Sequence, residues 1–251
     1  MYINNVHILY YVVAIVIGAI SGEIANWCNY RMPEYKKIFC KDFVEEYKLG
    51  KIKPNSILMI INALICVLLV YNFGINNNGV IENISLIKYI FLTPMLLSAF
   101  VIDYKYQIIP NRLNLSIFEA GLIFTFTEGL ININGAIDML FGMLAGGGIF
   151  LVITLIGGLI AGKEAMGFGD VKFMGALGLF FGLSNIIVIT IISFLISAII
   201  SIALIVFKIR KADEYIPFGP FIVVSSFLAM LVPFSTLIYI LLRVFTLGMY
   251  K

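Results

Sequence analysis

Charged residues are scarce in this sequence, and that scarcity excludes an ordinary soluble domain. Only 12% of the 251 residues are Asp, Glu, Lys or Arg, whereas soluble domains contain about 25%. Hydrophobic residues make up 61% of the chain, and the mean hydropathy is +1.05. This composition predicts a protein that crosses a membrane several times, rather than a globular domain with a single anchor.

Cysteine is also scarce, and aromatic residues do not accompany the basic ones. The three cysteines, Cys28, Cys40 and Cys66, form no CxxC pair and no spacing typical of a metal site. The basic residues flank apolar runs instead of lying on an aromatic-rich face, so nothing indicates nucleic-acid binding. We therefore expect ordinary reduced thiols, contacts with membrane lipid and no nucleic-acid partner.

Long apolar runs dominate the remainder of the chain. They lack the strict alternation of membrane strands, so we predict an all-α polytopic protein with about eight transmembrane helices and short cytoplasmic loops. The segment 173–183 is too short for an ordinary span, and the last segment contains Pro233, which divides or kinks it. The predicted segments are 7–25, 57–73, 86–102, 113–130, 139–161, 173–183, 186–207 and 218–244.

Lysine and arginine are distributed unevenly over the predicted loops. One side of the membrane receives 14 of the 17 basic residues, and cytoplasmic loops normally carry such an excess. We therefore predict that this side faces the cytoplasm, with both termini outside if segment 173–183 is a crossing. The 14 residues are Arg31, Lys36, Lys37, Lys41, Lys48, Lys51, Lys53, Lys105, Arg112, Lys163, Lys172, Lys208, Arg210 and Lys211, and the other side holds Lys88, Arg243 and Lys251.

Two aspartates lie where apolar segments meet predicted cytoplasmic loops. Asp103 follows one apolar segment, and Asp170 ends the sequence Gly-Phe-Gly-Asp. A carboxylate at the membrane edge is costly and usually functional. Two close carboxylates do not both ionise readily, so one can accept a proton from water while the other donates one to a carbonyl. The pair predicts metal-free hydrolysis of a peptide bond by Asp103 and Asp170.

Residues beside the aspartates suit an active-site loop. Gly167 and Gly169 would allow unusual backbone conformations and the close approach of a peptide. Pro110 ends any helix before it, and Asn111 would cap the following one. Lys172 would act on the acids electrostatically or anchor the loop at the membrane surface. Two unrelated loop aspartates remain an alternative from spacing alone.

Four segments in order resemble the type IV prepilin peptidases, a family of GxGD-type aspartic proteases. Residues 163–172 (KEAMGFGDVK) resemble the second catalytic segment, and Asp103 with residues 109–111 (IPN) resembles the first. Residues 216–221 (IPFGPF) resemble a late segment of the family. The amino-terminal signature is matched by Gly22, Asn26, Arg31 and Pro33.

The resemblance implies a prepilin leader peptidase in the inner membrane of a bacterial cell. Such an enzyme cuts the basic leader from type IV prepilins and pseudopilins at the cytoplasmic face, just before their apolar helix. Asp103 and Asp170 correspond to the family's catalytic aspartates. The chain would divide into an amino-terminal region, 1–84, and a catalytic membrane domain, 85–251.

The sequence departs from the family in its first loop. Many members hold zinc there with two CxxC pairs, whereas this chain has only Cys28 and Cys40 in that area, so we predict no zinc. Many members also methylate the new amino terminus with S-adenosylmethionine. The matched Asn26, Arg31 and Pro33 leave that second activity open. A cation- or proton-coupled transporter is the alternative of another class, and it would place its acids near the middle of the membrane.

Overall fold

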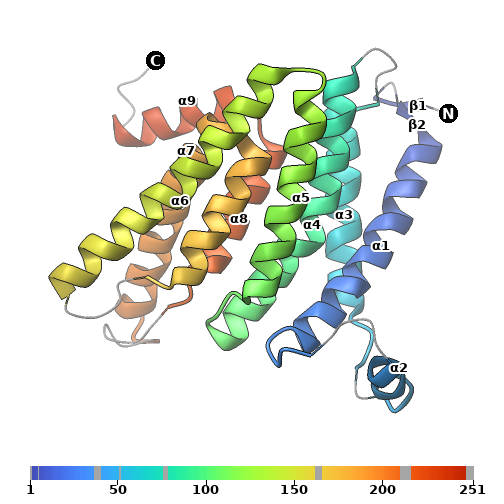
Figure 1. The fold of residues 1–251 in the computed structure, drawn as a ribbon, viewed down its shortest axis with the longest axis horizontal. Helices are drawn as coiled ribbons and strands as arrows, with labels where there is room; N and C mark the ends of the chain where they lie inside the picture. The colour runs from blue at the N-terminus through green and yellow to red at the C-terminus, as the bar shows by residue number, and fades with distance from the viewer. Residues whose placement is uncertain are drawn as a thin grey trace.

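The helices of the chain form a single bundle, with two short strands before the first helix (Figure 1). The computed structural model describes residues 2–4, 6–36, 41–50, 52–75, 79–161, 166–209 and 216–246. The predicted all-α class is confirmed. In chain order the elements are β1 Tyr2–Ile3, β2 Val6–His7, α1 Ile8–Arg31, α2 Lys41–Lys48, α3 Ser56–Phe73, α4 Val80–Tyr106, α5 Asn111–Gly129, α6 Ile133–Ala161, α7 Phe168–Val206, α8 Gly219–Leu231 and α9 Phe234–Phe245.

Five helices in the described part of the chain are long and apolar enough to cross a membrane: α1, α3, α4, α6 and α7. Helices α8 and α9 are apolar but shorter. Helix α5 has 19 residues but carries Arg112, Glu119 and Glu128, which lower its hydropathy. The predicted multi-pass membrane protein is therefore confirmed, with five long apolar helices and several shorter or more polar ones in the described residues.

Helix α7 is two antiparallel arms rather than one long rod. Gly182 has φ 73° and ψ 177°, which is not a helical conformation and which favours glycine. A Cβ placed on Gly146 would lie 2.5 Å from the Met174 carbonyl oxygen and 3.0 Å from Ile186 Cγ1. In a straight helix residues 174 and 186 would be about 18 Å apart. The chain therefore reverses at Gly182, and the short segment predicted at 173–183 crosses the bundle.

The end of the chain confirms the predicted division at Pro233. Helix α8 ends at Leu231, whose carbonyl accepts a hydrogen bond from Asn72 of α3 at 2.8 Å. Pro233 then caps α9, which lies across one end of the bundle (Figure 1). Both termini lie at that end. Helix α2, the end of α4 that carries Asp103 and the start of α7 that carries Asp170 lie at the opposite end.

Glycines let several helices approach at backbone distance, α6 and α7 among them. A Cβ on Gly142 would lie 2.5 Å from the Gly178 carbonyl oxygen, and Gly178 in turn faces the Gly142 backbone. Gly18 and Gly22 place α1 equally close to the α3 backbone. Small residues at such crossings allow the van der Waals contact that drives helix association in lipid.

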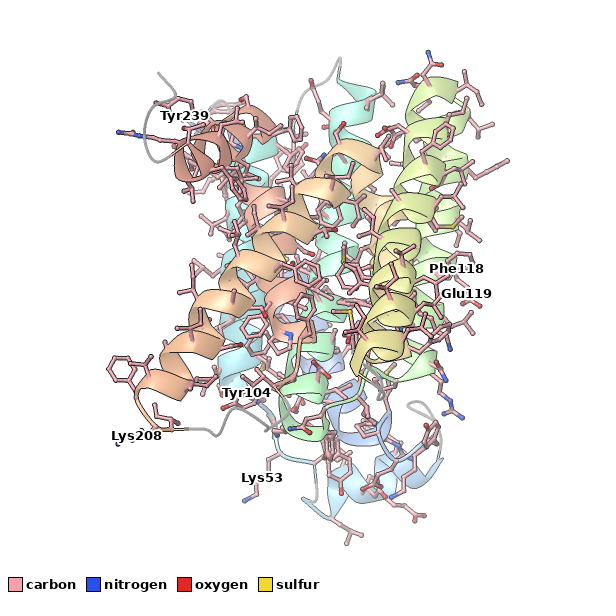
Figure 2. All side chains as sticks on the ribbon, turned by 90° about the vertical axis from the view of Figure 1, so that its left-hand side faces the viewer. Lys53, Tyr104, Phe118, Glu119, Lys208 and Tyr239 are labelled. Atoms are coloured by element: carbon pink, nitrogen blue, oxygen red, sulfur yellow. The ribbon has the colours of Figure 1, made fainter. Side chains whose placement is uncertain are left out.

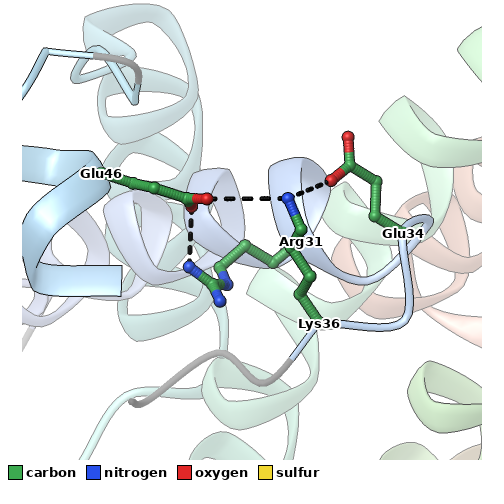
Figure 3. A network of polar contacts seen from close by, with 4 residues as sticks. All are labelled: Arg31, Glu34, Lys36 and Glu46. Atoms are coloured by element: carbon green, nitrogen blue, oxygen red, sulfur yellow. Dashed lines mark hydrogen bonds and ion pairs between the residues drawn. The ribbon is translucent and has the colours of Figure 1, made fainter. Parts of the chain in front are cut away.

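The end of α1 and the surface helix α2 are joined by ion pairs (Figure 3). The Arg31 side chain is 2% exposed and donates to Glu46 of α2 at 2.7 Å. Lys36 lies 2.7 Å from Glu34 and 3.6 Å from Glu46. The hydrogen bond from Lys36 holds the pKa of the exposed Glu34 carboxyl below its usual range. The short surface helix α2 is thus fixed to the end of α1.

The charge distribution predicts Lys88 on the non-cytoplasmic side, within the apolar segment 86–102. Lys88 belongs to α4, is 4% exposed and lies 3.6 Å from Glu128 of α5. A buried ammonium is tolerated there because a carboxylate faces it. The structure thus places this basic residue inside the helix bundle. Several predicted loop positions, including Lys163, Arg210 and Lys211, lie outside the described residues.

Candidate active site

The structure brings every site residue singled out in the sequence to one cavity of about 350 Å³. Asp103 lies in the last turn of α4, and Asp170 lies in the first turn of α7. Their exposed fractions are only 3% and 4%, and they are close enough for the charge of Asp103 to act on Asp170. The predicted lining residues are Asp103, Pro110, Asn111, Gly167, Gly169, Asp170 and Lys172, and the others include Tyr35 and Gln107.

The carboxylate of Asp103 is held by the start of α8. The backbone N–H of Gly219 donates to Asp103 Oδ2 at 2.8 Å. This donor belongs to the first turn of a helix, whose unpaired N–H groups and dipole favour negative charge. The hydrogen bond fixes the position of one oxygen of the Asp103 carboxylate.

The loop between α4 and α5 turns sharply beside Asp103. Gln107 adopts a left-handed conformation with φ 56°, and its N–H donates to the Asp103 carbonyl at 2.8 Å. Pro110 then has an extended backbone and immediately precedes α5. Helix α4 therefore ends at Tyr106, three residues after Asp103, and the chain is no longer helical when it reaches Pro110.

Two hydrogen bonds tie the start of α5 to the first turns of α7, which carry Asp170. Lys172 donates to Asn111 Oδ1 at 2.9 Å, and its ammonium lies 5.4 Å from the centre of the Phe168 ring. Asn114 Nδ2 donates to the Gly169 carbonyl at 3.0 Å. These contacts hold the start of α7 against α5, which directly follows the loop after Asp103.

Two details of the predicted loop are wrong. Gly167 has φ −66°, a conformation open to any residue, and Gly169 lies within the first turn of α7. Small size matters at Gly169, because a Cβ there would lie 3.3 Å from the Ile109 carbonyl oxygen. Asn111 does not cap α5 through its side chain, since that side chain accepts from Lys172 instead.

Gly219 and Asn114 are contacts that sequence reasoning did not single out. Gly219 lies in the segment IPFGPF, which resembles a family motif but gave no hint of its partner. Asn114 lies three residues after Asn111 on α5, and helical spacing would have placed both near one face. The signal for Asn114 was therefore present, whereas the contact of Gly219 with Asp103 required the fold.

Gly219→Ala should lower the turnover rate while leaving the protein folded. The added Cβ would lie 2.6 Å from Asp103 Oδ2, and the carboxylate can rotate away more easily than α8 can move. Misplacing a catalytic group by about 1 Å can cost about 100-fold in rate. For the peptide hydrolysis that the sequence predicts, we expect a loss of roughly that size in kcat with little change in KM, measured with purified protein in detergent.

The matched control is Gly148→Ala in α6, where an added Cβ finds nothing within 4 Å. That variant should keep wild-type turnover. Unchanged kcat in Gly219→Ala would show that contact with Gly219 does not set the position of Asp103.

No group of three or more His, Cys, Asp or Glu in the described residues could hold a metal ion. Cys28 and Cys66 are free thiols, and Cys40 lies outside the described residues. The absence of zinc stays a prediction.

The fold and the cavity define a multi-pass α-helical membrane protein with a buried carboxylate pair at one end of its bundle. Residues 90–202 match the model of the type IV leader peptidase family. This region contains both aspartates, so the part of the chain that carries the carboxylate pair is similar to that family.

Curated relatives carry the name prepilin leader peptidase/N-methyltransferase. The relative from Aeromonas hydrophila is 30% identical over 140 residues, which are 56% of this chain and 47% of the relative. That from Escherichia coli is 32% identical over 129 residues, 50% of this chain and 54% of the relative. The relative from Pseudomonas aeruginosa is 26% identical over 211 residues, which are 83% of this chain and 68% of the relative. The chain spans about half the length of the first of these relatives, and no solved structure matches it.

Proposed function

We propose that the chain is a prepilin leader peptidase, an aspartic endopeptidase that cleaves the basic leader of type IV prepilins and pseudopilins. The observation that carries the proposal is the convergence of Asp103 and Asp170 in one cavity. The match of residues 90–202 to the type IV leader peptidase model and the names of the relatives support the choice of substrate.

The proposed reaction uses both carboxyl groups and a water molecule. The ionised member of the pair accepts a proton from water, whose oxygen attacks the scissile carbonyl carbon. The protonated member donates its proton to the carbonyl oxygen. Collapse of the tetrahedral intermediate then breaks the C–N bond, and the leaving amine takes up a proton from the pair. The peptide is hydrolysed without a metal ion or a covalent intermediate.

We place the site at the cytoplasmic face of the inner membrane. The carboxylate cavity lies at the bundle end that carries α2, where Lys36, Lys48 and Arg112 also belong. Excess basic residues normally mark the cytoplasmic side. The division into regions 1–84 and 85–251 remains a prediction, and α4, which begins at Val80, packs against α1 and α3 as well as α5 and α8.

The transporter alternative is less well supported by the geometry. Asp103 and Asp170 occupy the terminal turns of their helices instead of the middle of the bundle. Transporter sites normally lie near the membrane midplane. The position of the pair at one end favours hydrolysis at the membrane surface.

Methylation of the product is a second proposed activity, and it is suggested by the relatives' name. Two of the matched residues have structural partners: Asn26 donates to the Lys53 carbonyl at 2.9 Å, and Arg31 pairs with Glu46. They therefore do not by themselves indicate a place for S-adenosylmethionine.

The test is cleavage of a prepilin by membranes that contain this chain and no other prepilin peptidase. Mass spectrometry of the product reports the cleavage position and any additional methyl group. Leader removal supports the peptidase, and an added mass of one methyl group supports the second activity. Failure to cut several prepilins in correctly inserted protein would overturn the proposal.

A further inference from the structure

A second cavity adjoins the carboxylate cavity and runs along the outside of the bundle. It measures about 440 Å³ and is lined mainly by apolar side chains. We call it the α5–α6 groove, and its lining includes Asn111, Leu115, Phe118, Met143, Lys172 and Gly175.

The arrangement of three helices creates this groove. Helices α5 and α6 are joined by a short turn at one end and diverge toward the end that carries Asp103 and Asp170 (Figure 1). The first arm of α7 lies between them and supplies Gly175. Gly175 has no side chain to fill the space between α5 and α6. Because these two helices diverge, the α5–α6 groove is widest beside the carboxylate cavity.

The outer wall of the groove faces away from the bundle. Leu115 of α5 is 54% exposed, and Figure 2 shows Phe118 at the outer edge of the bundle. Along α5 the lining extends from Asn111 to Phe118, about 10 Å or two helical turns. An apolar helix arriving from the lipid would meet this groove without crossing another helix.

We propose that the α5–α6 groove receives the first two turns of the substrate's apolar helix. The inference rests on the proposed function, since a prepilin is cut just before that helix. Asn111 and Lys172 line both cavities, so the groove and the carboxylate pair are continuous. A scissile bond placed at the aspartates therefore puts the following helix into the groove.

A rival groove between α1 and α4 lacks this continuity. It measures about 360 Å³, is also apolar and includes Ile87 and Phe91. None of its lining residues lines the carboxylate cavity. A helix bound there would have no continuous path to Asp103 and Asp170.

Leu115→Trp tests the groove by filling it. We expect KM for a full-length prepilin to rise at least about tenfold, because apolar contact with the helix is lost. The fall in kcat should be smaller, because Leu115 lies outside the carboxylate cavity.

Two matched variants serve as controls. Ile123→Trp adds the same bulk to an exposed position of α5 outside the groove, and Ile87→Trp fills the rival groove. Both should keep the wild-type KM. The proposal would be overturned if Leu115→Trp kept the wild-type KM, which would indicate that lipid rather than substrate occupies the groove. It would also be overturned if only Ile87→Trp raised KM.

Photo-crosslinking tests the unaltered groove, so the inference does not depend on how the tryptophan variant folds. A prepilin with a photoreactive residue in the first turn of its apolar helix would be bound to Asp103→Asn protein. Crosslinks at Leu115 or Met143 support the inference, and crosslinks at Ile87 or Phe91 overturn it. Cleavage by the wild type separates these outcomes from failure of the proposed function, which would abolish cleavage altogether.

Discussion

Asp103→Asn and Asp170→Asn should each reduce prepilin cleavage by about 1,000-fold or more, because either change removes one of the two groups that move protons. Asparagine keeps the size of the side chain and can still accept from the Gly219 N–H at Asp103. The loss should therefore appear in kcat with the protein still inserted and folded. The measurement is single-turnover cleavage of a prepilin by equal amounts of purified enzyme.

Glu119→Gln is the control for loss of a carboxylate. Glu119 is an exposed residue of α5, appears at the outer edge in Figure 2 and does not line the carboxylate cavity. The Glu119→Gln variant should cleave the prepilin at the wild-type rate. Full activity in either aspartate variant would remove that residue from the catalytic pair.

The double variant Asp103→Asn with Asp170→Asn should be no worse than either single variant. Groups that act as one unit in a reaction give strongly non-additive losses. Additive losses would instead indicate that the two aspartates act independently, and that result would contradict a shared proton.

Gly178→Ala should lower the free energy of unfolding substantially, although it adds only one methyl group. The new Cβ would overlap the Gly142 carbonyl and the Met143 backbone, neither of which can rotate away. Helix α6 must then separate from the first arm of α7. Overpacking of this kind typically costs about 1–3 kcal/mol, and we expect the upper end of that range. The measurement is the free energy of unfolding in detergent by titration with denaturant.

The comparison for this stability prediction is again Gly148→Ala, on the same helix α6. There an added Cβ meets open space, and replacing glycine by alanine in a helix gains up to about 1 kcal/mol. The two substitutions should thus shift stability in opposite directions. Equal stability of Gly178→Ala and the wild type would show that α6 and α7 do not approach at backbone distance.

Much of this architecture follows from local sequence. Apolar runs of sufficient length dictate helices, because the lipid offers no other partner for the backbone. Pro233 cannot continue a helix, and it divides the last segment as predicted. The two aspartates could be recognised from sequence because they are charged residues at the ends of apolar runs, where a carboxylate without a function is costly.

Other features depended on how the helices are ordered in space. The Gly219 N–H reaches Asp103 across 116 positions of sequence, and Lys88 meets Glu128 of another helix. Hydropathy and periodicity describe which face of a helix avoids water, but they do not say which helix becomes its neighbour. In lipid every apolar face is equally satisfied by the solvent, so close packing and polar contacts select the neighbours. The sequence therefore determined the spans and the chemical groups, and only the tertiary structure decided that Asp103 and Asp170 share a cavity beside an apolar groove.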